Sequence, residues 1–227
     1  MLGVVTRGTV MLGVVTGLQS EARLVAGLPL RVVSGGGQAE ATRHKIDALI
    51  AQGVSGLISF GIAGGLDPAL RTGDLVISAT VVDAAGRHYA GSPAWLERAL
   101  GLLPSCAAGH VYASDRIVET TAEKHRLFTT FDALAADMES HHVARAAERY
   151  GLPFLVIRAV SDTAGETLPA GLAAGVDADG GTRILPILAG LGTGRLGLAA
   201  VMQAGRSAGK ALKALKQARP LLAQISA

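Results

Sequence analysis

The chain has 227 residues, of which 49% are hydrophobic and 17% are charged, a balance that excludes an intrinsically disordered protein and suffices for one sizeable core. The formal net charge of +3 is too small to indicate nucleic-acid binding, so no nucleic-acid partner is expected. The single cysteine excludes an intramolecular disulfide and a zinc site built on paired cysteines.

The N-terminal region contains the hexapeptide MLGVVT twice, at residues 1–6 and 11–16. We interpret residues 1–10 as an extension, and we predict a single domain over residues 1–227. Arg7 interrupts the early apolar stretch and no clear cleavage site follows it, so a secretory leader is not expected. No window supplies the roughly 20 apolar residues of a membrane-spanning helix. We therefore expect a cytoplasmic protein.

Short apolar runs, many of them β-branched, alternate along the chain with helical stretches. Strands are predicted at Leu12–Thr16, Leu30–Ser34, Gly56–Phe60, Asp74–Val82, Leu134–Asp137 and Phe154–Val160. Helices are predicted at Gln38–Gln52, Pro93–Leu103, Thr121–Phe131 and Met138–Tyr150, and a long helical stretch is predicted from about Ile184. Consecutive apolar positions are typical of strands buried on both faces. The alternation predicts a three-layer α/β fold with a twisted mixed central sheet.

Two glycine clusters follow predicted strands, where ligands bind in such folds. Gly35–Gly37 precede a helix, and Gly61, Gly64 and Gly65 follow the third strand. Their amides either face an anion or a ribose, or serve turn geometry alone. Neither cluster matches a dinucleotide fingerprint, so a dinucleotide-dependent oxidoreductase is the weaker alternative. The chain also lacks a P-loop and a serine nucleophile elbow.

Three carboxylates, those of Glu21, Glu139 and Asp162, each follow an apolar strand. Cleavage of an N-glycosidic bond needs an acid at the departing base, and acceptors at the sugar hydroxyls and the attacking water. Carboxylates gathered in one cleft would meet these needs, and burial with mutual repulsion would raise at least one pKa. The alternative for each residue alone is a helix cap or a solvated charge.

Six motifs in order resemble those of the purine nucleoside phosphorylase and methylthioadenosine/S-adenosylhomocysteine nucleosidase superfamily. They are Gly17…Glu21, Ser34-Gly35-Gly36-Gly37, Gly61-Ile62-Ala63-Gly64-Gly65-Leu66, Gly73-Asp74-Leu75-Val76, Asp137-Met138-Glu139 and Arg158-Ala159-Val160-Ser161-Asp162. Each motif is weak alone, but together they cover roughly residues 11–165. The resemblance implies a nucleoside phosphorylase-like fold and an enzyme that cleaves purine nucleosides.

The resemblance also implies roles for individual residues. Asp162 would protonate the purine at N7, with Ser161 positioning it, and Glu139 would hold the ribose hydroxyls. Glu21 and Arg158 would orient a nucleophilic water. Further substrate-binding candidates are Met138 at the sugar, Ile117 and Val118 at the base, and Ala63, Gly64, Asp137 and Ser34. Asp137 stands where relatives usually carry a longer Glu.

The expected reaction is release of adenine from a 5′-substituted adenosine. The segment after Val82 is short, and the overall pattern resembles the hopanoid-associated phosphorylase branch, which implies adenosylhopane as substrate. The alternatives are a methylthioadenosine/S-adenosylhomocysteine nucleosidase, a phosphate-dependent purine nucleoside phosphorylase, and a nucleoside-binding module without catalysis. Several phosphorylases of the superfamily carry a phosphate-holding arginine shortly before the central glycine-rich strand end, and no basic residue lies in Leu57–Phe60 here. The resemblance therefore slightly favours water over phosphate, although Ser34 and its glycines keep phosphate open.

No cofactor is expected, with inorganic phosphate as co-substrate only for a phosphorylase. No metal is expected at His141-His142, because no third ligand appears at a matching spacing. The resemblance implies a homodimer or a higher homo-oligomer. A basic C-terminal helix, with Arg206, Lys210 and Lys213 opposite Leu212 and Leu215, would allow peripheral contact with the inner membrane face; the alternative is a packing helix with a solvated basic face.

Overall fold

The computed structural model describes residues 11–168, 180 and 198–225. The expected extension at residues 1–10 and the first part of the predicted C-terminal helical stretch, up to residue 197, lie outside the described residues. The elements, in chain order, are β1 (Leu12–Thr16), α1 (Gln19–Leu24), β2 (Leu30–Ser34), α2 (Ala39–Ala51), β3 (Gly56–Gly65), β4 (Leu75–Ser78), β5 (Thr80–Asp83), β6 (His88–Ala90), α3 (Pro93–Leu102), β7 (Ala107–Ala108), β8 (His110–Ala113), α4 (Thr121–Phe131), β9 (Ala133–Asp137), α5 (Ser140–Tyr150), β10 (Phe154–Asp162), α7 (Leu198–Leu215), η2 (Lys216–Ala218) and α8 (Arg219–Ile225).

The strands form one mixed sheet in the order β6-β5-β8-β9-β3-β10-β4-β7, and β1 pairs with both β2 and β3. The β1–β2, β1–β3 and β3–β10 pairs are parallel, whereas β4 pairs with β10 in the antiparallel sense. The long central strands β3 and β10 therefore run side by side, and their carboxyl ends meet at one edge of the sheet.

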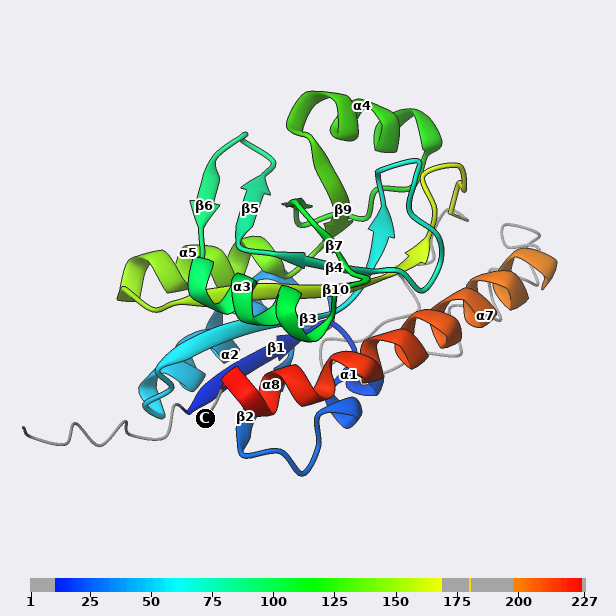
Figure 1. Cartoon of the computed structure of the whole chain (residues 1–227). Coiled ribbons are helices and arrows are strands. Elements are labelled where there is room, and N and C mark those ends of the chain that lie inside the picture. The colour runs from blue at the N-terminus through cyan, green and yellow to red at the C-terminus, as the bar shows by residue number, and fades with distance from the viewer. Residues whose placement is uncertain (1–10, 169–179, 181–197, 226–227) are drawn as a thin grey trace, which may run out of the picture.

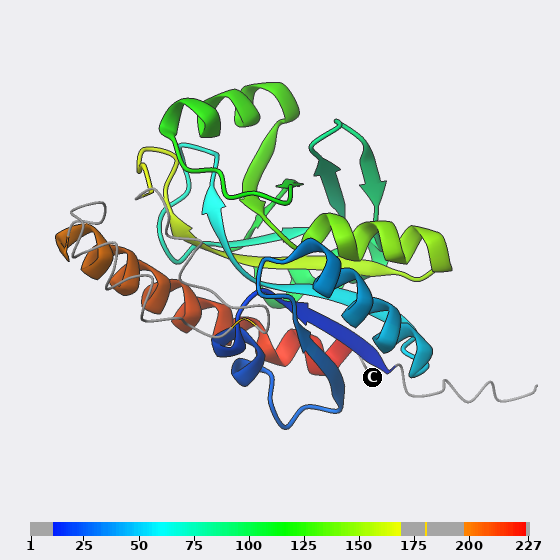
Figure 2. The same ribbon diagram turned by 180° about the vertical axis from the view of Figure 1, so that it is seen from behind.

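Helices cover both faces of this sheet (Figures 1 and 2). Along β10, Phe154, Val156 and Val160 pack into the core beneath α2 and α5. The alternate residues Leu155 and Ile157 pack into a second core beneath α3, α7 and α8. This period of two is what a strand buried on both faces requires. The predicted three-layer α/β fold with a mixed sheet is confirmed.

The predicted strand Asp74–Val82 is wrong in one respect, because the chain makes two strands there. The hydroxyl of Ser78 accepts a hydrogen bond from the Thr80 amide at 2.9 Å and donates one to the Thr80 carbonyl at 2.6 Å. This turn breaks the strand, so β4 pairs with β10 while β5 pairs with β8. The elements α1, β6, β7 and β8 were not predicted, since each is short or lacks a strong apolar period.

The C-terminal helices belong to the core. Ala211 and Leu215 of α7 are fully buried, and Leu222 of α8 is also fully buried. Arg206 and Lys213 stay exposed on the outer side of α7. The packing helix with a solvated basic face therefore describes this segment. Among the described residues, no helix combines the length and the apolar character needed to cross a membrane.

Candidate active site

A buried guanidinium, that of Arg158 on β10, lies at the centre of the candidate site. Arg158 is 0% exposed, and its Nε donates to Oδ2 of Asp137 at 2.8 Å. Its Nη2 donates to the hydroxyls of Ser59 at 2.6 Å and Ser140 at 3.2 Å, and lies 3.6 Å from Oε2 of Glu139. The strand period places Arg158 and Ser59 on the face beneath α5. A charge buried this deeply is stable only because several acceptors surround it.

Glu21, on the short helix α1, brings a second carboxyl close enough to interact with the guanidinium of Arg158. Its Oε2 accepts from the amides of Gly17 and Leu18, and its Oε1 accepts from the amide of Ile62, each at 2.8 Å. Burial raises the pKa of this carboxyl, while Arg158 and the three amides act in the opposite direction. The side chain therefore joins the β1–α1 loop to the carboxyl half of β3.

Glu139 occupies the N-cap position of α5, where its side chain makes no capping hydrogen bond, and it is only 6% exposed. Burial raises its pKa to about 8; Arg158 opposes the shift, and the nearby carboxylates of Asp137 and Glu21 add to it. A methyl group added at Gly17 would lie 2.9 Å from Oε1 of Glu139, so the β1–α1 loop borders this carboxyl. Burial and the neighbouring carboxyls therefore favour the protonated form of Glu139.

One donor of this network is unused. Nη1 of Arg158 is buried and has no hydrogen-bond partner within the described part of the chain. A methyl group at Gly61 would lie 2.3 Å from that nitrogen and 2.8 Å from Oε1 of Glu21, so only glycine lets both groups approach the backbone of β3 here. A free guanidinium donor and a carboxyl acceptor near the same glycine are the groups needed to hydrogen-bond and orient a water molecule.

Asp162 ends β10, four residues after Arg158, and is 7% exposed. Ser161 donates to its Oδ1 at 2.7 Å, and Nζ of Lys124 lies 2.5 Å from its Oδ2. Lys124, on α4, is fully buried and also donates to the carbonyls of Thr163 and Glu166 at 2.8 Å each. All three ammonium hydrogens thus have acceptors. Lys124 fixes Asp162 and the turn that follows it.

Three of the remaining predicted residues, Ala63, Gly64 and Met138, lie near the carboxyl of Asp162 or the glycine turn. The Ala63 carbonyl accepts from Ser161 at 3.1 Å, and a methyl at Gly64 would lie 3.1 Å from Oδ2 of Asp162, so both border the carboxyl. Met138 is half-buried, and its methyl would lie 3.4 Å from a methyl built at Gly37.

Three predicted residues, Ser34, Ile117 and Val118, lie outside the network of charged side chains. The hydroxyl of Ser34 lies 2.9 Å from that of Thr16, and its carbonyl accepts from Nζ of Lys45 at 2.7 Å. Val118 packs into a small apolar cluster around Leu66, and Ile117 beside it is half-buried. No described contact joins these three residues to the carboxylates.

Asp137 has a different position from the one expected of a substrate ligand. Its Oδ1 accepts from the amides of Glu139 at 2.9 Å and Ser140 at 2.7 Å, and its Oδ2 accepts from Arg158 and from the Ser140 hydroxyl. The side chain is 1% exposed. All its acceptor positions are used within the protein, so Asp137 holds Arg158 and the start of α5 in place.

Sequence reasoning did not identify Ser59, Ser140 and Lys124. Ser59 is the one polar residue in the apolar run Leu57–Phe60, and such a residue in a doubly buried strand signals a buried partner. Lys124 lies three residues before the buried Leu127 on α4, an inward-facing position that a lysine rarely takes. Ser140 offered no comparable signal.

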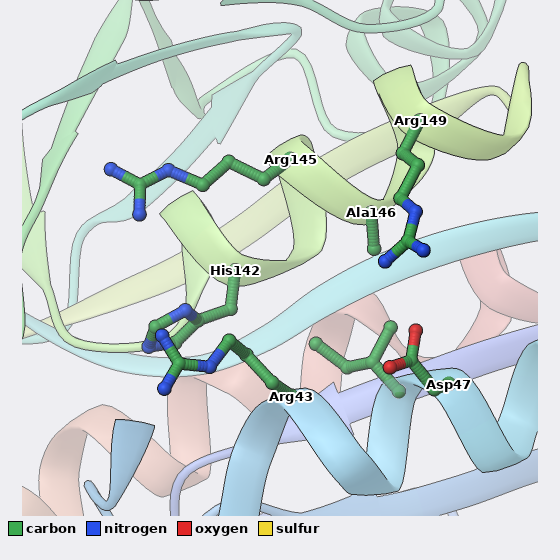
Figure 3. A pocket seen from close by; sticks show the side chains of 7 residues that line it. Arg43, Asp47, His142, Arg145, Ala146 and Arg149 are labelled. Atoms are coloured by element: carbon green, nitrogen blue, oxygen red, sulfur yellow. The ribbon is translucent and has the colours of Figure 1, made fainter. Parts of the chain in front are cut away.

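A hollow of about 110 Å³ between α2 and α5 is separate from this network (Figure 3). It is lined by Arg43, Ile46, Asp47, His142, Arg145, Ala146 and Arg149. None of these residues contributes a carboxylate or the guanidinium described above, so the hollow is not the candidate active site.

Comparisons with known proteins identify the family to which the sequence is related. The sequence model of a family described as the phosphorylase superfamily matches residues 14–183. Similar relatives are 5′-methylthioadenosine/S-adenosylhomocysteine nucleosidases of Anoxybacillus flavithermus, 33% identical over 132 residues and 48% of this chain, and of Tolumonas auensis, 31% identical over 140 residues and 50% of this chain. The matched segments span 57% and 59% of the length of these relatives.

Two solved structures share the fold over nearly the whole chain. The nucleosidase of the same name from Helicobacter pylori has a TM-score of 0.73 at 17% identity, covering 96% of this chain and 100% of its own. The futalosine hydrolase of Helicobacter pylori has a TM-score of 0.70 at 17% identity, covering 95% and 98%. Identity this low supports the fold alone.

Proposed function

The chain belongs to the phosphorylase superfamily, and from this we propose that it hydrolyses the N-glycosidic bond of a 5′-substituted adenosine and releases adenine. The observation that carries the proposal is the buried, unpartnered Nη1 of Arg158 beside Glu21, with Glu139 in the same network. Hydrolysis needs a held water on one side of the sugar and an acid at the base on the other. Asp162 supplies the carboxyl for the second position.

We assign the roles as follows. Asp162, oriented by Ser161, passes a proton to N7 of adenine, so that the base does not leave as an anion; the ammonium group of Lys124, paired with Asp162, is the adjacent source of that proton. Glu139 binds the ribose hydroxyls, against which Met138 packs. Glu21 and Arg158 orient the water that attacks the sugar carbon as positive charge develops there. Ile117, Val118, Ala63 and Gly64 line the base. This chemistry needs no redox or group-carrying cofactor.

The charge balance favours water over phosphate as the acceptor. The single guanidinium of Arg158 is already paired with the carboxylate of Asp137 and also faces the carboxyls of Glu21 and Glu139, so no positive charge is left to balance a phosphate dianion. The two sequence relatives are named as nucleosidases, which also supports water. Phosphorolysis stays the second candidate, because Lys45 brings a cation to the glycine turn that follows Ser34.

The 5′ substituent is the finer part of the proposal. Only residues 84–87 separate β5 from β6, consistent with a short wall after Val82 and with a bulky, lipid-linked adenosine of the adenosylhopane kind. The alternative substrates are 5′-methylthioadenosine and S-adenosylhomocysteine, after which the relatives are named. A cytoplasmic homo-oligomer, in contact with the inner membrane face if the substrate is a lipid, completes the proposal.

Adenine release from 5′-methylthioadenosine and from an adenosyl-lipid analogue, each with and without inorganic phosphate, tests these statements together. Phosphate-independent release supports hydrolysis, and a strict phosphate requirement would replace it by phosphorolysis. Asp162→Asn is expected to lower kcat by roughly 10²–10⁴-fold, the usual contribution of a positioned acid. Nucleoside binding without any adenine release would instead indicate a binding module.

A further inference from the structure

Three potential metal ligands converge outside the network around Arg158. His141 and His142 are consecutive residues of α5, and Asp115 follows β8. Nε2 of each histidine lies 2.9 Å from Oδ1 of Asp115. The sequence spacing offered no third ligand to the histidine pair, because Asp115 precedes His141 by 26 residues and only the fold brings them together.

The two imidazoles are buried and incompletely satisfied. His141 is 2% exposed and His142 is 3% exposed. Among the described residues, Nδ1 of both rings has no hydrogen-bond partner, and neither does Nε2 of His142, which is near Asp115 but not aligned for a hydrogen bond. Buried polar atoms without partners are uncommon in native proteins, and a bound ion is one of the few explanations for them.

We propose that Asp115, His141 and His142 form a binding site for a divalent transition-metal ion of the zinc class. The ligand atoms lie within 4.8 Å of one another. Donors that bind one tetrahedral ion at about 2.0–2.2 Å lie roughly 3.3–3.6 Å apart, so small side-chain movements suffice. The Asp115 side chain is 59% exposed, which gives the ion a path of entry and leaves room for a water ligand.

The ligand types select the kind of ion. The set consists of two buried imidazoles and one exposed carboxylate. Arg43 and Arg145 oppose a cation here, although Arg145 is paired with Asp83 at 2.7 Å. Arg43 and His142 line the same hollow (Figure 3). Two imidazoles favour zinc, copper or nickel over magnesium or calcium.

The ion would join two parts of the candidate active site without taking part in the cleavage. Asp115 lies in the loop that carries Ile117 and Val118, whereas the histidines follow Glu139 on α5. Binding would therefore tie the loop proposed to line the base to the helix that presents the ribose-binding carboxyl.

Titration of chelator-treated, folded protein with zinc chloride, followed by calorimetry, tests the site directly. We expect one ion per chain. Asp115→Ala should weaken binding at least about 100-fold, since even a partner behind a ligand contributes roughly 10–100-fold. Asp115 is exposed, so this variant is expected to fold. His44→Ala is the matched control, because His44 is exposed on α2 and lies outside the cluster.

Cobalt(II) gives an independent readout of the ligands. Visible absorption bands of tetrahedral cobalt should appear with wild type and His44→Ala, and should be absent with Asp115→Ala. Absence of saturable binding to the folded wild type would overturn the proposal. Zinc affinity unchanged in Asp115→Ala would overturn it equally. Neither result depends on the proposed hydrolysis, which is measured separately by adenine release.

Discussion

Gly61 is the position at which the candidate site tolerates least added volume. A methyl group there would lie 2.3 Å from Nη1 of Arg158 and 2.8 Å from Oε1 of Glu21, both well inside contact distance. Neither group can withdraw freely, because Arg158 is held by Asp137, and Glu21 accepts from three amides. Gly61→Ala must therefore displace at least one member of the network.

The size of the effect follows from these contacts. Overpacking a dense interior by one methyl group costs about 1–3 kcal/mol, and displacing the buried guanidinium from its acceptors adds to that. A displacement of about 1 Å in a group that orients a reactant costs roughly 10²-fold in rate. We expect Gly61→Ala to lower kcat by 10²-fold or more by this reasoning, and to reduce the free energy of unfolding measurably.

Gly101→Ala is the matched control. Gly101 lies in α3, and a methyl group there meets nothing within 4 Å. Alanine is favoured over glycine inside a helix by about 0.5–1 kcal/mol, so this variant should be as stable as wild type or more so, with unchanged adenine release. Urea unfolding and steady-state kinetics report both quantities. Wild-type kcat in folded Gly61→Ala would refute the assignment of Arg158 and Glu21 to the orientation of the nucleophile.

Three further predictions follow. The pKa of Glu139 is raised to about 8, so the folded protein holds its proton more tightly than the unfolded chain, and stability should fall as the pH rises from about 4.5 to 8. Urea unfolding across this range should show a smaller fall for Glu139→Gln, which should also lower kcat more than it raises KM. Lys124→Met leaves the carboxylate of Asp162 without its buried partner and should destabilise the protein by about 3–5 kcal/mol and lower kcat/KM; wild-type values for both would contradict the ion pair. Arg206→Ala and Lys213→Ala remove exposed charges from α7 and should leave activity on soluble nucleosides intact, whereas a loss there would show that this face contributes to the site.

The apolar runs predicted β1 and β2 with their observed bounds. Each is a single unbroken strand, β1 lying beside the central strand β3 and β2 pairing with β1. The same criterion ended β3 at Phe60, although the strand continues to Gly65. Glycine has low intrinsic preference for strands, so only the pairing with β10, from Leu57 to Gly64, reveals the extension. Pairing between strands that are far apart in the sequence cannot be recognised from any short segment of the sequence.

The same limit applies to the candidate site. Motif order identified Glu21, Glu139, Arg158 and Asp162, and the fold brings the first three into one network. The partner of the fourth, Lys124, is 38 residues away from it and carries no motif. A side chain that belongs to a distant element can be assigned to the site only when the connections between the strands of the sheet are known.

The charge count of the network explains why one carboxyl must be protonated and what that proton does. Three carboxyls, those of Glu21, Glu139 and Asp137, face the one guanidinium of Arg158, and full ionisation would leave a buried excess of negative charge. Burial places the proton on Glu139 below about pH 8. As the glycosidic bond breaks, the sugar gains positive charge, which stabilises the ionised form of Glu139 and so favours release of that proton. The excess negative charge, which is unfavourable in the free protein, is then balanced by the positive charge of the sugar in the transition state. Under the proposed hydrolysis, kcat should therefore rise with pH towards 8, and Glu139→Gln should remove that rise; a profile unchanged in Glu139→Gln would assign the titration to another group.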